Sequence, residues 1–178
     1  AAKKKALIDD LMAVYDKRVK YFGNDKRYGK DWIVSRKVQD YFAQTGENAD
    51  YNLAYGWLKE IVNEKGENCE ALGLSLFAFS SMKKMVADPN FKEQYIQDYL
   101  VASNGLDAQI KAAQAANNKK EEDNLTAYKS GVDGQFANSG AADCETLQNL
   151  YAAKIEENKD NLDYLKETVS LLRRMRCQ

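Results

Sequence analysis

Histidine is absent from this chain of 178 residues. It is the most common general base, the base of the usual catalytic triads and a favoured zinc ligand, so a chain without it has few routes to such sites. The clustered carboxylates do not provide an alternative acid–base pair or metal site, because adjacent residues of a helix point in different directions. No glycine-rich phosphate-binding loop is present. We therefore expect no enzyme activity, no metal site and no cofactor. The carboxylate clusters are Asp9–Asp10, Glu121–Asp123 and Glu156–Glu157.

Proline occurs once, at Pro89, and no segment sustains the alternation of polar and apolar residues that is typical of a strand. The longest weakly polar run, from Ala71 to Met82, is too short and too interrupted to span a membrane. The net charge of −1 gives no overall attraction to nucleic acid or to an anionic membrane. These features predict an all-α protein without a transmembrane segment.

Helical periodicity covers most of the chain, and turn-forming residues divide it into about eight helices. We expect Gly46 and Gly66 to end two of them, and Asn48 and Asn68 to cap the helices that follow. With their caps, the expected helices span about residues 5–22, 29–44, 48–65, 68–87, 90–116, 121–138, 143–158 and 160–178. In the first helix, the residues expected to face the core are Leu7, Ile8, Leu11, Val14, Tyr15, Val19 and Phe22.

A large apolar residue followed by a tyrosine four positions later occurs near the start of four of these helices. Residues four apart share a helix face, so each pair marks a surface that packs on another helix. We expect each tyrosine to be buried against the partner helix of its own hairpin. The recurrence predicts stacked antiparallel hairpins in a single helical-repeat domain over residues 1–178. The pairs are Leu11–Tyr15, Tyr51–Tyr55, Phe91–Tyr95 and Leu147–Tyr151.

This pattern resembles that of the tetratricopeptide-repeat (TPR) family, whose first helix carries a large residue, an apolar residue and then a tyrosine. Ile8, Leu11 and Tyr15 fit all three positions, but Met12 stands where the family has a small residue, and the repeat here is longer than 34 residues. The closing proline of the family is missing. The chain also resembles the N-terminal part of exported bacterial TPR-containing proteins. The resemblance implies a TPR-like α-α superhelix that acts as an interaction scaffold, as part of a longer protein.

Cys144 opens the seventh expected helix and Cys177 lies near the end of the eighth. In an antiparallel hairpin of helices with these lengths, the two residues lie at the same level, within bridging distance. They are either a disulfide or two free thiols. The resemblance to exported proteins favours the disulfide and a periplasmic or cell-envelope location; the alternative is the cytoplasm. Cys69 has no evident partner and is expected to be a small core residue.

Two groups of residues are candidates for partner binding. Tyr51 and Trp57 lie on one short segment, and Trp57 points away from the face of the buried Tyr55, either to a partner or to the next hairpin. The stretch 17–37 interleaves cations with aromatic residues, a composition that can bind phosphates and stack bases. It is also compatible with an ordinary solvated surface on which Trp32 packs inward. The candidate cations of this stretch are Arg18, Arg27 and Arg36.

From these observations we expect a non-enzymatic scaffold that binds a protein or peptide on the surface formed by the first helices of the hairpins. The alternative is a binder of nucleic acid or another anionic ligand through residues 17–37. The two differ in salt dependence, because phosphate contacts weaken steeply with salt. The sequence names neither a partner nor an oligomeric state.

Overall fold

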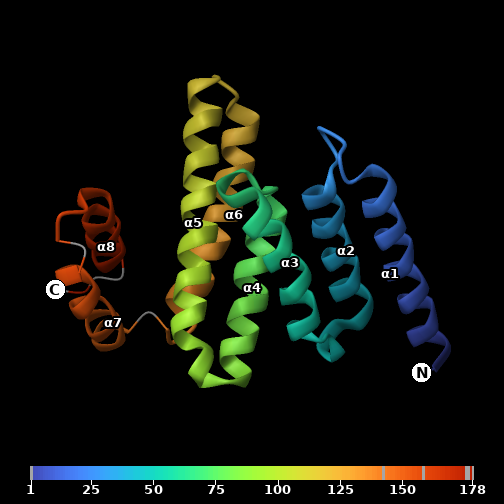
Figure 1. The fold of residues 1–178 in the computed structure, drawn as a ribbon, viewed down its shortest axis with the longest axis horizontal. Coiled ribbons are helices and arrows are strands. Elements are labelled where there is room, and N and C mark those ends of the chain that lie inside the picture. Colours follow the sequence, from blue (N-terminus) through green and yellow to red (C-terminus); the bar gives the residue numbers. More distant parts are fainter. Residues whose placement is uncertain (1, 142, 158, 175–176, 178) are drawn as a thin grey trace. The chain divides into compact units, whose positions relative to one another are not determined.

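The computed structural model describes residues 2–141, 143–157, 159–174 and 177. The expectation of an all-α fold of antiparallel helical hairpins is confirmed (Figure 1). None of the helices in the described part is long and apolar enough to cross a membrane. The helices are α1 (Ala2–Phe22), α2 (Lys30–Thr45), α3 (Tyr51–Lys65), α4 (Ala71–Ala87), α5 (Lys92–Ala115), α6 (Lys119–Asn138), α7 (Cys144–Glu157) and α8 (Leu162–Arg174).

The chain divides into two compact units, residues 1–132 and 133–178, where the sequence predicted one domain. The boundary falls inside α6, between Gly131 and Gly134, and glycine is among the weakest helix formers. In the first unit, each helix from α1 to α5 packs on the next, and α2 also packs on α4. α6 lies beside α5 (Figure 1), and Lys129 forms an ion pair of 3.4 Å with Asp107. The second unit contains the hairpin of α7 and α8.

The same tripeptide, Gly-Glu-Asn, connects α2 to α3 and α3 to α4, each time as a short 3-10 helix: η1 (Gly46–Asn48) and η2 (Gly66–Asn68). Both glycines have φ near +57°, a conformation that side chains disfavour, and each donates its backbone N–H to the helix that it ends. The asparagines therefore belong to the turns, and the expectation that Asn48 and Asn68 cap the next helices is wrong. Asp50 caps α3 and Glu70 caps α4.

Asp88 caps a 3-10 helix, η3 (Pro89–Phe91), with proline in its first turn, and α5 follows directly after it. The start of α8 differs from the expectation. α8 begins at Leu162 and not directly after Asp160. α5 continues without interruption through Gly105. A Cβ at this glycine would lie 2.9 Å from Leu74 Cδ1, so glycine allows α4 and α5 to approach closely.

The repeated tyrosines are buried at three of the four positions, as expected. Tyr15 donates a hydrogen bond to Asp40 of α2, and Tyr55 stacks on Phe77 of α4 with ring centroids 5.4 Å apart. Tyr95 is also buried. The side chain of Tyr151 lies outside the described residues. These buried rings contribute to the packing of the helices, so the repeated tyrosines stabilise the fold.

The first helix is less buried than the sequence predicted. Leu7, Val14 and Phe22 are exposed, whereas Met12, which was not on the expected core face, is buried with Tyr15. The reason is that α1 lies at the end of the first unit and packs chiefly on α2 (Figure 1). A helix with one main neighbour buries only one stripe, so part of its apolar surface stays exposed.

Candidate functional site

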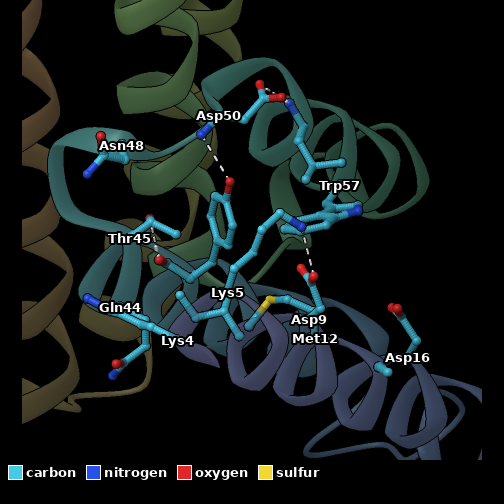
Figure 2. A pocket seen from close by; sticks show the side chains of 14 residues that line it. Lys4, Lys5, Asp9, Met12, Asp16, Gln44, Thr45, Asn48, Asp50 and Trp57 are labelled. Atoms are coloured by element: carbon cyan, nitrogen blue, oxygen red, sulfur yellow. Dashed lines mark hydrogen bonds and ion pairs between the residues drawn. The ribbon is translucent and has the colours of Figure 1, made fainter. Parts of the chain in front are cut away.

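A groove of about 660 Å³ lies between α1, the C-terminal end of α2 and the N-terminal half of α3 (Figure 2). One wall is a single face of α1, because its lining residues recur at helical spacing. The opposite wall carries Leu53 and Trp57 of α3, and Tyr41 of α2 lies between. The volume is in the range of ligand pockets, and the lining combines apolar side chains with polar ones at the edge. The α1 residues are Lys4, Lys5, Ile8, Asp9, Met12, Ala13 and Asp16.

Trp57 is held in place by two side chains of α2. The Lys37 ammonium lies 3.9 Å from the centroid of the Trp57 ring and forms an ion pair of 2.5 Å with Asp16 of α1. Lys37 is almost fully buried, and a cation on an aromatic face contributes about 2 kcal/mol when desolvated. The edge of Tyr41 packs on the same indole, with centroids 5.5 Å apart. The groove therefore contains a large aromatic side chain whose orientation is fixed before any ligand binds.

The polar edge of the groove offers both hydrogen-bond donors and acceptors. The side-chain amides of Gln44 and Asn48 are exposed, and neither has a hydrogen-bond partner among the residues that the structure describes. Asp50, in contrast, is engaged: its carboxylate accepts from the backbone N–H groups of Asn52 and Leu53 at 2.9 and 3.1 Å. Exposed amides such as these can both donate hydrogen bonds to a peptide backbone and accept them from it.

Charges of both signs border the groove. Lys5 forms an exposed ion pair of 2.9 Å with Asp9, visible in Figure 2, and Asp16 keeps most of its side chain exposed although it pairs with Lys37. The pKa of Lys5 is raised by this hydrogen bond and by the charge of Asp9. The mixture of signs gives no general preference for an anionic or a cationic ligand.

The arginines of the stretch 17–37 gather at a different place, around Trp32. Arg18 and Arg36 lie 5.6 and 5.2 Å from the Trp32 ring. Arg27 lies on Tyr28, whose ring packs edge-on against Trp32. We call these five residues the arginine–aromatic cluster.

Several cations of this stretch, including one of the cluster, pair with carboxylates of the protein. Arg36 lies 3.4 Å from Glu70, and Lys30 contacts both Glu60 and Glu64 at 2.7 Å. The buried Lys37 pairs with the exposed Asp16. These pairs reduce the positive charge that the stretch offers to an anionic ligand.

Tyr51 does not line the groove of Trp57, although the two residues are close in sequence. Its ring packs on Phe42 and Phe79, and it borders a separate hollow of about 400 Å³ with Lys83 and Lys84. The five residues expected to bind a partner therefore lie in three places: Trp57 in the groove, Tyr51 at this hollow, and the arginines in the arginine–aromatic cluster.

In the second unit, Cys144 and Cys177 form a disulfide with Cα atoms 5.2 Å apart, the arrangement that the helix lengths predicted. The bond joins the start of α7 to the residues after α8 and closes the hairpin. Cys69 in the first unit is buried, and burial raises the pKa of its thiol to about 12, so it stays uncharged and unreactive at neutral pH.

Most groove residues were not identified from the sequence. Ile8, Met12, Tyr41, Gln44 and Leu53 come from three segments, and only the fold brings them together. One signal was present: Met12 occupies the position where the TPR family has a small residue. The larger side chain fills part of the space between α1 and its neighbours and forms the floor of the groove.

Among the described residues, no group of three or more potential metal ligands comes together. A comparison with family models, with curated proteins and with solved structures finds no match to this chain. The proposal for function therefore depends on the groove itself.

Proposed function

We propose that this protein is a non-enzymatic scaffold that binds a peptide segment of a partner protein in the groove between α1, α2 and α3. The observation that carries the proposal is the fixed indole of Trp57 beside the exposed Leu53 and the exposed amides of Gln44 and Asn48. Rigid aromatic side chains in a pocket are typical centres of binding energy, because little entropy is lost when the ligand arrives.

The expected ligand is a short segment with at least one large apolar side chain. That side chain would pack against Trp57, Leu53 and Met12, and the backbone of the segment would form hydrogen bonds with Gln44 and Asn48. The resemblance to TPR proteins supports this proposal, because their first helices line the binding surface, and α1 and α3 are the first helices of their hairpins. The same resemblance and the disulfide support an exported protein of a bacterial cell envelope.

Selection from a random dodecapeptide library, displayed on phage and panned on the whole chain, tests the proposal. Leu53→Asp places a charge in the apolar wall and should weaken binding of the selected peptides at least tenfold. Val101→Asp on α5 is the matched control, because Leu53 and Val101 are 45% and 44% exposed and the chemical change is similar. Val101→Asp should leave binding unchanged. Failure to select any peptide, or equal binding to Leu53→Asp, would contradict the proposal.

The alternative, binding of nucleic acid through residues 17–37, requires cations that are free to contact phosphates. Its strongest support is the exposed Arg27, and its weakness is the internal pairing of Lys30, Arg36 and Lys37. Binding of single-stranded oligo-dT, measured at about 50 and 200 mM salt, separates the two functions. Tight binding that falls steeply with salt and is lost in Arg27→Ala would favour the alternative.

A further inference from the structure

The face of α1 that points away from α2 carries an apolar stripe. Leu7, Val14 and Tyr21 are 60%, 51% and 71% exposed, although each is a large apolar or aromatic residue. They are seven residues apart, so they lie in one line along the helix. The buried side chains of Met12 and Tyr15 lie on the other side of the helix. This α1 stripe (Leu7, Val14 and Tyr21) is separate from the groove.

Two side chains of opposite charge lie along one side of the α1 stripe. Asp10 lies four residues before Val14 and Lys17 lies three residues after it, and both are exposed. On a helical wheel of 100° per residue, the two side chains point to the same side of the stripe. Within the described part of the chain, neither forms an ion pair or a hydrogen bond. The flank therefore presents a negative and a positive charge on either side of Val14.

We propose that a second copy of this chain docks on the α1 stripe, with the two α1 helices antiparallel about a two-fold axis at Val14. Such an axis places Leu7 of each copy beside Tyr21 of the other, because both are seven residues from Val14. It also brings Asp10 of each copy to Lys17 of the other, on the same flank. The spacing of seven residues is that of helices packed at a small crossing angle.

This charge arrangement is self-complementary, which supports a second copy as the occupant. In an antiparallel pair, the flanks that carry Asp10 and Lys17 lie on the same side of the interface, so each charge meets its opposite. In a parallel pair, the two flanks would lie on opposite sides, and neither attractive contact would form. A single helix pair is a small interface, so the dimer should be weak, with a Kd on the order of micromolar. The groove lies on another side of α1 and stays open.

Sedimentation velocity of the whole chain, from about 5 to 500 µM, tests this dimer with charge exchanges. Asp10→Lys and Lys17→Asp each replace two attractive contacts with two repulsive ones, and each should weaken dimerisation at least tenfold. The double variant Asp10→Lys/Lys17→Asp restores opposite charges and should dimerise within about threefold of the unaltered chain. An equimolar mixture of the two single variants should form a heterodimer, because every contact in it is attractive.

Lys111→Asp on α5 is the matched control: it makes the same charge change at an exposed position on another helix and should not alter dimerisation. Circular dichroism of all variants checks that these exposed substitutions leave the fold intact. A chain that is monomeric over the whole range, or that forms larger assemblies, overturns the proposal. A dimer that is insensitive to the single substitutions also overturns it, because its interface then lies elsewhere.

Discussion

α1 and α4 both carry apolar residues on much of their surface, but their surroundings differ. α4 packs on α2, α3 and α5, and most of its residues from Ala71 to Ser81 are buried. α1 packs chiefly on α2 and buries Met12 and Tyr15. The number of neighbours, and not the apolar content alone, decides which of these residues stabilise the fold.

The consequence for function is that apolar side chains of α4 are used for packing, whereas those of α1 remain available. Both surfaces proposed for binding lie on α1: the groove on one side and the α1 stripe on another. Substitutions around α4 should therefore reduce stability strongly, and those on exposed α1 positions should change binding and leave stability almost unaltered.

The largest effect is expected from Tyr95→Ala. Tyr95 of α5 is buried, and removing a buried aromatic ring costs about 3–5 kcal/mol, which approaches the whole stability of a small domain. Val14→Ala on the α1 stripe should change stability by less than about 0.5 kcal/mol. Urea unfolding at a few micromolar protein, where self-association is negligible, measures both. Equal losses would show that α1 is packed as tightly as the interior.

The next effect concerns the second unit. Replacing Cys144 and Cys177 by serine removes the disulfide across 33 residues and should destabilise the α7–α8 hairpin by about 3–4 kcal/mol. The first unit does not contain the bond, so its stability should not change. Hydrogen exchange followed by mass spectrometry separates the two units. Loss of protection in α3 and α4 would contradict the assignment of the bond to the second unit alone.

A third effect concerns the polar network beside α4. The buried Asp98 accepts hydrogen bonds from Tyr55 at 2.9 Å, from Ser81 at 2.6 Å and from Gln94 at 2.8 Å. Asp98→Ala leaves these donors unpaired and should cost about 3 kcal/mol. Asp98→Asn keeps the size and one acceptor oxygen, so its cost should be smaller. A thermal unfolding series shows the order, and an alanine variant as stable as the asparagine variant would refute the role of the network.

The smallest effect is the response to alkaline pH. Burial and the hydrogen bond to Asp40 raise the pKa of Tyr15 from 10.0 to about 12. Because the folded state holds the proton more tightly, this contribution to stability is complete below pH 10 and is lost as the pH rises through about 12. Tyr15→Phe removes the ionisable group. Urea midpoints at pH 9, 10 and 11 should fall less steeply for this variant, and parallel slopes would contradict the account.

The sequence predicted the helices well because each depends on local periodicity and on nearby glycines. It also identified the buried tyrosines and the cysteine pair, since both follow from helix geometry. It failed at Asn48 and Asn68, because the Gly-Glu-Asn tripeptide forms a 3-10 turn and the cap moves two residues on, to Asp50 and Glu70. Asparagine favours the cap position of a helix, but this preference does not determine at which residue the preceding turn ends and the helix begins.

The burial of Leu7 and Val14 was wrongly predicted because periodicity shows that a face is apolar, not that a neighbour covers it. The groove could not be predicted for a related reason. Its residues lie on α1, α2 and α3, and which of them converge depends on the packing of these helices. Trp57 was recognised as a residue off the core stripe, but its neighbours Lys37 and Tyr41 were not.

The most direct test of peptide binding in the groove is the fluorescence of Trp57 during titration with a selected peptide. Trp32→Phe leaves Trp57 as the single tryptophan and keeps an aromatic ring in the arginine–aromatic cluster. The account predicts a saturable shift of Trp57 emission, with the same Kd as calorimetry, that is absent in Leu53→Asp. Binding by calorimetry with no change in Trp57 emission would place the peptide elsewhere and contradict the account.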